Sequence, residues 1–139
     1  MFQTLRKLQE SQYSVFETKD GNFKVNFSYS KWKISESITL NIDSLRVVIS
    51  EFIPIKTTLA YFAINYSASY TKKMFYAIKH YIKACNTNDG LFSKECMKYY
   101  YKVVRSLDYT HAESVKYFFI KISGLYPSLF SAEIIIFLE

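Results

Sequence analysis

The spacing of the apolar residues changes near residue 43, and this change constrains the fold more than any other feature of the chain. Before it, two segments alternate in polarity on either side of Asp20-Gly21, with Phe23, Val25, Phe27 and Tyr29 on one face of the second. Asp-Gly between alternating segments favours a β-hairpin. A third β-rich run follows at 37–42. The sequence therefore predicts a small three-stranded antiparallel sheet, preceded by a short helical or frayed lead at 4–10.

From residue 43 onward the apolar residues follow a helical period. Asp43 or Ser44 can cap a helix that runs to Phe52, because a short polar side chain accepts a free backbone N–H at a helix start. Pro54 lacks an N–H, so we expect it to end or kink that helix. A second helical stretch is predicted over 57–64.

Three further helices are predicted after residue 68. The first starts at Ser69 or Thr71 and runs to about Ala84, and the turn-forming segment 86–90 follows it. Ser93 caps the next helix, which extends to about residue 107. Thr110 caps the last one, to about residue 123, with Gly124 as its C-terminal cap. We expect its inward face to be formed by Val115, Phe118, Phe119 and Ile122.

The predicted fold class is therefore mainly α, with a small N-terminal antiparallel β-sheet or hairpin followed by a four- to five-helix orthogonal bundle. We predict two parts, a β-rich segment over 1–42 and a helical domain over 43–139. The last residues, 134–138, are all apolar. Because such a patch is unusual at the end of a soluble domain, we expect the natural polypeptide to continue.

Composition excludes several classes of protein. Half of the 139 residues are hydrophobic, and only three are glycine and two proline, which argues against disorder and against a loop-rich β fold. No glycine-rich phosphate-binding loop is present. No apolar run reaches the length of a membrane span, and the start of the chain does not resemble a secretory signal. We expect a cytoplasmic protein that does not bind membranes.

Basic residues are concentrated in one part of the chain. Eight Lys and Arg residues but only two acidic ones lie between 68 and 106, so this segment carries a net charge of +6, equal to that of the whole chain. A local excess of positive charge is typical of nucleic-acid binding. Solvated lysine faces are also common on ordinary helices. The scarcity of acidic residues at i, i+4 spacing favours the binding interpretation.

We therefore predict that these two helices bind duplex DNA. Lysine contacts go mostly to phosphates, which position a protein without reading base sequence. Tyrosine and threonine hydroxyls can add hydrogen bonds to phosphate, from Tyr76 and Tyr99 among others. The candidate DNA-binding residues are Tyr70, Thr71, Lys72, Lys73, Lys79, Lys83, Lys94, Lys98, Lys102 and Arg105.

Evidence for catalysis is weak in this sequence. His80 and His111 have no thiol or carboxylate at metal-ligand spacing, so we expect neither a metal site nor a cofactor. Cys85 and Cys96 lie in apolar helical patterns, which predicts buried free thiols. A small enzyme that uses one of these cysteines as a nucleophile is an open alternative.

The helical part, from Ile42 to Phe130, resembles the core-binding domain of phage-type tyrosine recombinases (integrases). The resemblance rests on the segments YSASYTKKMFYAIKHYIKA (66–84), FSKECMKYYYKVVRS (92–106) and DYTHAESVKYFFIKI (108–122). The segment FKVNFSYSKWKISESITLNI (23–42) is similar to the β-rich lead of many such proteins.

The resemblance implies a SAM-like helical domain that forms one half of a clamp around duplex DNA. The family's catalytic domain follows this region and carries two arginines, a lysine, a His-x-x-Arg stretch and the nucleophilic tyrosine. No His-x-x-Arg occurs here. The resemblance therefore implies a DNA-binding, non-catalytic part of a site-specific recombinase, truncated before its catalytic domain. The alternative is a helical protein-interaction or oligomerisation module that binds other copies of the same protein and no DNA.

Overall fold

The structure is a computed structural model that describes residues 15–85, 90–104 and 109–129. The chain divides into two compact units, Met1–Phe75 and Tyr76–Glu139. This division falls inside a helix, whereas the sequence predicts a boundary after residue 42. The predicted lead at 4–10 and the apolar end at 134–138 lie outside the described residues.

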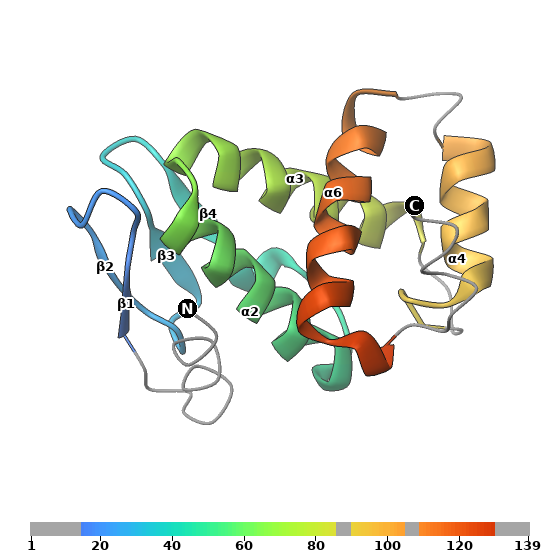
Figure 1. The fold of residues 1–139 in the computed structure, drawn as a ribbon, viewed down its shortest axis with the longest axis horizontal. Helices are drawn as coiled ribbons and strands as arrows, with labels where there is room; N and C mark the ends of the chain where they lie inside the picture. Colours follow the sequence, from blue (N-terminus) through green and yellow to red (C-terminus); the bar gives the residue numbers. More distant parts are fainter. Residues whose placement is uncertain (1–14, 86–89, 105–108, 130–139) are drawn as a thin grey trace. The chain divides into compact units, whose positions relative to one another are not determined.

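The fold is mainly helical, with short strands at the N-terminal end, which confirms the predicted class. Figure 1 shows the strands preceding the helices in the chain. In chain order the elements are β1 (Val15–Glu17), β2 (Lys24–Asn26), β3 (Lys31–Lys33), β4 (Thr39–Asn41), η1 (Ile42–Ser44), α2 (Ile49–Asn65), α3 (Ala68–Ala84), α4 (Lys94–Tyr99), the π-helix η2 (Tyr100–Val104), α6 (Tyr109–Leu125) and η3 (Pro127–Leu129).

The strands form two separate two-stranded hairpins, so the prediction of one three-stranded sheet is wrong. β1 pairs with β2 and β3 with β4, both antiparallel, with Phe16 opposite Val25 and Trp32 opposite Leu40. β2 stops at Asn26 because the Asn26 side chain accepts the backbone N–H of Ser28 at 2.9 Å and turns the chain. Tyr29, predicted on the inward face, is exposed for this reason.

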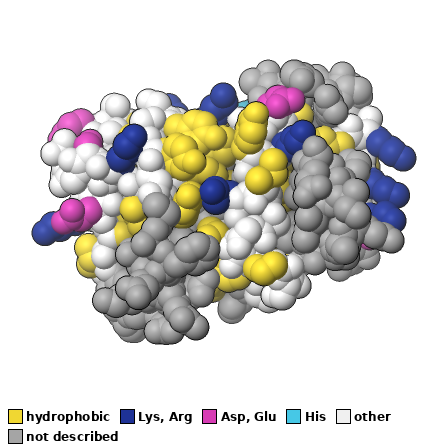
Figure 2. All heavy atoms as spheres, in the orientation of Figure 1, with side chains coloured by type: hydrophobic (Ala, Val, Ile, Leu, Met, Phe, Trp, Pro, Cys, Tyr) yellow, Lys and Arg dark blue, Asp and Glu magenta, His cyan; other side chains and the backbone are white. Residues whose placement is uncertain are grey.

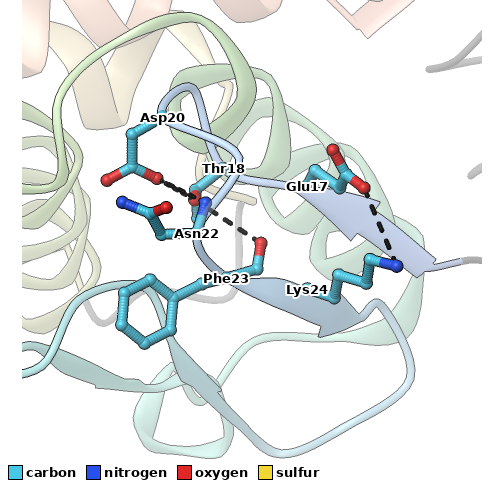
Figure 3. A network of polar contacts seen from close by, with 6 residues as sticks. All are labelled: Glu17, Thr18, Asp20, Asn22, Phe23 and Lys24. Carbon is cyan, nitrogen blue, oxygen red and sulfur yellow. Dashed lines mark hydrogen bonds and ion pairs between the residues drawn. The ribbon is translucent and has the colours of Figure 1, made fainter.

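The first hairpin turns at Asp20-Gly21, as predicted. Gly21 has φ +75°, a conformation that glycine adopts without steric cost. The Asp20 carboxylate accepts the backbone N–H of Asn22 at 3.0 Å and the Thr18 hydroxyl at 2.7 Å (Figure 3). These bonds tie the side chain of Asp20 to the backbone and side chain of the turn.

α2 differs from its prediction at both Asp43 and Pro54. Residues 42–44 form a 3₁₀ turn instead of a helix start, and α2 begins only at Ile49. Pro54 lies inside α2, which continues through it to Asn65. Every residue from 54 to 60 is buried. Burial on all sides of this segment outweighs the backbone hydrogen bond that proline removes.

A buried lysine lies in the core of the first unit. The Lys56 ammonium is 4.8 Å from the ring centroid of Phe27, 5.4 Å from that of Phe52 and 5.9 Å from that of Trp32. Burial lowers the pKa of Lys56 from its usual value, while the charge of Asp43 opposes this shift. The three aromatic faces compensate part of the lost hydration through cation–π attraction.

The second unit is built around Tyr81. Its hydroxyl donates to the carbonyl of Leu91 at 2.6 Å, and its ring is 5.0 Å from Tyr100 and 4.7 Å from Phe119. Burial raises the pKa of Tyr81. The predicted inward face of α6 is confirmed, since Val115, Phe118, Phe119 and Ile122 are fully buried.

Two details of the predicted last helix are wrong. Thr110 lies inside α6, which starts at Tyr109, so it does not occupy the cap position. Gly124 also lies inside α6, which continues to Leu125, and the N–H of Tyr126 still bonds to the carbonyl of Ile122 at 2.8 Å. The helix therefore ends beyond the predicted glycine cap.

Candidate nucleic-acid interface

The helix α3 starts at Ala68, slightly earlier than predicted, because Ser67 supplies the cap. The Ser67 hydroxyl accepts the backbone N–H of Tyr70 at 3.1 Å, and its carbonyl accepts the N–H of Thr71 at 3.0 Å. Capping of this kind satisfies backbone donors that have no partner inside the helix.

One side of α3 packs into the protein and the other is exposed and basic. The exposed positions include Lys72, Lys73, Tyr76 and Lys83, and Lys79 is half-buried. The helix contains no Asp or Glu. The buried side is formed by Thr71, Met74, Phe75, Ala77, Ile78 and Tyr81. Lys72, Lys73 and Lys83 therefore lie on the exposed side of this helix.

Three lysines of α3 differ from two lysines of the hairpins in their ion pairing. On the hairpins, Lys24 lies 3.9 Å from Glu17 and Lys33 lies 3.8 Å from Glu36. Within the described part of the chain, no ion pair involves Lys72, Lys73 or Lys83. We call these three residues, together with Lys79, the α3 lysine face. Its charge is not neutralised by acidic neighbours on the same helix.

The second group of predicted DNA-contacting lysines, Lys94, Lys98 and Lys102, is spaced less regularly. Ser93 caps α4 as predicted, its hydroxyl accepting the N–H of Cys96 at 3.2 Å. Lys98 and Lys102 are exposed and Lys94 is half-buried. Figure 2 shows Lys and Arg side chains along the edge of the molecule over α4.

Within the described residues, the regular α-helix predicted from Ser93 onward is interrupted. α4 ends at Tyr99 and continues as a π-helix to Val104, which changes the angular spacing of the side chains. Lys102 therefore departs from the regular α-helical spacing of Lys94 and Lys98. Glu95 is exposed beside Lys94 and reduces the net charge of α4. Arg105 lies outside the described residues.

Two of the predicted contact residues have other roles in the structure. The Thr71 side chain is fully buried, and its hydroxyl donates to the carbonyl of Ser67 at 2.9 Å. Thr71 therefore cannot reach a phosphate in this conformation, and its prediction as a contact is corrected. The half-buried ring of Tyr70 packs 4.9 Å from Tyr66 and 5.9 Å from Phe62.

In the second unit the two histidines lie together, and so do the two cysteines. The rings of His80 and His111 stack at 4.6 Å, and His80 Nδ1 is 3.0 Å from the Tyr100 hydroxyl. Both cysteines are buried and free, as predicted. Burial raises the pKa of Cys85 to about 12, which disfavours the thiolate that a nucleophile requires. Among residues with described positions, no three metal-ligating side chains gather.

Sequence reasoning missed a cavity of about 300 Å³ in the first unit. It lies between the turn of the first hairpin and the junction of α2 with α3. Its lining consists of Thr18, Lys19, Asp20, Ile34, Ala63, Tyr66, Ser67 and Ala68. The Asp-Gly turn was predictable, but nothing in the sequence indicates that it packs against residues 63–68.

Comparisons with protein-family models, curated proteins and solved structures found no match to this chain. Within the described ranges, no helix is long and apolar enough to cross a bilayer. The chemistry of the exposed residues therefore carries the functional argument.

Proposed function

We propose that this chain binds duplex DNA through the α3 lysine face, mainly by contacts with backbone phosphates. The observation that supports the proposal most strongly is the exposure of Lys72, Lys73 and Lys83 on a helix without a single acidic residue. Phosphate oxygens are the partners that such a surface attracts.

The geometry of α3 suits a run of phosphates. A helix rises about 1.5 Å per residue, so Lys72 and Lys83 are separated by about 16 Å along the axis. That length spans several phosphates of one strand. Lysine ammonium groups on flexible stems can adjust to the exact phosphate positions. Lys98 of α4 and Lys102 of η2 add charge for further phosphates.

We also propose that this binding serves DNA integration or recombination, in the non-catalytic N-terminal part of a site-specific recombinase. This context rests on the resemblance of residues 42–130 to core-binding domains. The cysteine-based enzyme is the weakest alternative, because the raised pKa of Cys85 works against it.

A protein-interaction module is the second candidate, and one observation favours it. Tyr117 and Ile120 on α6 are 54% and 43% exposed, and these positions lie on neighbouring turns of one helix. Exposed apolar side chains of this kind can contact a second copy of the chain. A mass that increases with concentration, measured without DNA, would support this candidate.

The proposal is tested by fluorescence-anisotropy titration of a labelled duplex over a series of salt concentrations. Lysine–phosphate contacts release condensed counterions, so the logarithm of affinity is expected to fall linearly and steeply with the logarithm of salt concentration. Unrelated duplex sequences are expected to bind with similar affinity. An absence of binding at low salt, or a flat salt dependence, would contradict the proposal.

A further inference from the structure

The lining of the cavity in the first unit combines aromatic, apolar and polar residues. The aromatic residue is Tyr66, which is 37% exposed, and the apolar residues are Ile34, Ala63 and Ala68. The polar residues are Thr18, Lys19, Asp20 and Ser67. Cavities that combine apolar surfaces with a few polar groups are typical of small-molecule and base-binding sites.

The ring of Tyr66 is held in place by other aromatic rings. Tyr66 lies 5.5 Å from Phe62 and 4.9 Å from Tyr70, with the planes tilted in both pairs. Tyr61 adds a further contact at 6.4 Å. A ring fixed by its neighbours on one side loses little freedom when a flat ligand stacks on the other, so it is suited to stacking.

Hydrogen bonds hold the polar residues that line the cavity. The backbone N–H of Lys19 donates to the carbonyl of Ala63 at 3.0 Å, which attaches the hairpin turn to the end of α2. Figure 3 shows the Asp20 carboxylate held by Thr18 and by the backbone of Asn22. The bond from the backbone of Asn22, followed by that from Thr18, lowers the pKa of Asp20, so this carboxylate is an acceptor at neutral pH.

The cavity adjoins the α3 lysine face. Ala68, which lines the cavity, is the first residue of α3, and Lys72 is four residues further along the same helix. Residues at i and i+4 lie on the same side of a helix, about 6 Å apart. A DNA strand with a phosphate at Lys72 therefore has its neighbouring nucleotide within reach of the cavity.

We propose that this cavity binds an unpaired nucleobase, stacked on Tyr66, with its amino edge donating to Asp20. The positive charge of the exposed Lys19 reduces the repulsion between the Asp20 carboxylate and the phosphate next to the bound base. A carboxylate acceptor favours adenine, cytosine and guanine, which carry exocyclic amino groups, over thymine. This inference rests on the proposed function, since it places a frayed end, a tail or an extruded base beside the duplex on the lysine face.

The inference is tested with two duplexes that differ only in a short single-stranded tail. One tail consists of deoxyadenosines and the other of abasic nucleotides, so the number of phosphates is the same. Stacking of one base on an aromatic side chain contributes about 1–3 kcal/mol, so the adenine tail is expected to strengthen binding roughly fivefold to a hundredfold over the abasic tail.

Two variants identify the cavity as the source of this gain. Tyr66→Leu removes the stacking ring, and Ala68→Phe fills the cavity from its half-exposed edge without altering the buried core. Both are expected to abolish the difference between the tails and to leave binding of the blunt duplex unchanged. Tyr117→Leu, at an exposed tyrosine of α6, is the matched control and is expected to retain the difference.

The carboxylate is tested by Asp20→Asn, which keeps an acceptor for Thr18 and Asn22. It is expected to reduce the preference for adenine over thymine tails. Equal affinity of the wild-type protein for adenine and abasic tails, with salt-dependent duplex binding intact, would overturn the inference and leave the proposed function standing. Loss of all duplex binding would instead contradict the proposed function.

Discussion

Two lysines of the hairpins and three lysines of α3 are placed in opposite ways. Lys24 and Lys33 each lie within 4 Å of a glutamate, Glu17 on β1 and Glu36 in the turn between β3 and β4. Lys72, Lys73 and Lys83 lie on a helix with no acidic residue. Both groups are exposed, so exposure alone does not distinguish them. What distinguishes them is whether neighbouring carboxylates already neutralise their charge.

Lys56 is placed in a third way, which differs from that of the hairpin lysines and that of the α3 lysines. It is as basic in sequence as the others, but its side chain is buried beneath three aromatic rings in the first unit. The number of lysines in a sequence therefore says little about binding. Their pairing and burial decide which of them can meet a phosphate.

The largest effect is expected from reversing the charge of the α3 face. Lys72→Glu, Lys73→Glu and Lys83→Glu together are expected to weaken duplex binding more than about a hundredfold, because several phosphate contacts become repulsive. The matched control combines Lys24→Glu, Lys31→Glu and Lys33→Glu on the hairpins, which changes the net charge equally. Anisotropy titration of both variants, with circular dichroism to confirm folding, compares them. Equal losses would show that net charge alone governs binding.

A smaller effect, on stability, is expected from Lys56→Met. The pKa of Lys56 is lower in the folded protein than its usual value of 10.5, so the unfolded chain binds the extra proton more tightly. Lys56 therefore destabilises the fold at neutral pH, and this penalty shrinks as pH rises toward 10.5.

Urea unfolding of wild type and Lys56→Met at several pH values measures this difference. Wild type is expected to gain stability relative to the variant between neutral pH and about pH 10, by about 1.4 kcal/mol for each unit of pKa shift. A difference that does not change with pH would show that the three rings compensate the burial fully.

The loss of a single lysine–phosphate contact is expected to change the salt dependence of DNA affinity. Lys72→Ala is expected to reduce the slope of log affinity against log salt by about 0.9, the amount associated with one neutralised phosphate. Lys24→Ala, at a hairpin lysine that lies 3.9 Å from Glu17, is the control and should leave the slope unchanged. An equal decrease in the two variants would remove the distinction between the two surfaces.

The smallest effect is expected at the hairpin ion pair. Glu17→Gln separates Lys24 from its partner and is expected to lower the free energy of unfolding by less than about 1 kcal/mol, since exposed pairs contribute little. Thermal unfolding measures the stability. If Glu17→Gln strengthened DNA binding several-fold, Lys24 would belong to the interface and the comparison would fail.

The elements that depend on local sequence were predictable. Ser93 caps α4 and the Asp-Gly turn forms the first hairpin, because both need only neighbouring residues. Pro54 does not end α2, one of the two predicted outcomes, because every residue from 54 to 60 is buried, and such burial depends on tertiary packing. Tyr29 was misplaced because the side chain of Asn26 ends the strand.

The candidate site shows the same division. The exposure of the α3 lysines follows from helical periodicity, and the sequence predicted it. The burial of Thr71 was not predicted, because the sequence placed the helix cap at Ser69 or Thr71, whereas Ser67 supplies it in the structure. The ring cage around Lys56 and the cavity beside Tyr66 depend on residues far apart in the chain. Contacts of this kind are set by tertiary packing, which periodicity and turn signals do not encode.

Lysine footprinting tests the central claim most directly, because it compares both surfaces in one unmodified protein. The chain is acetylated briefly with and without saturating duplex DNA, and the modification of each lysine is measured by mass spectrometry. We predict that DNA protects Lys72, Lys73 and Lys83, whereas Lys24, Lys31 and Lys33 react equally in both states. Protection of the hairpin lysines with unchanged reactivity on α3 would contradict the account.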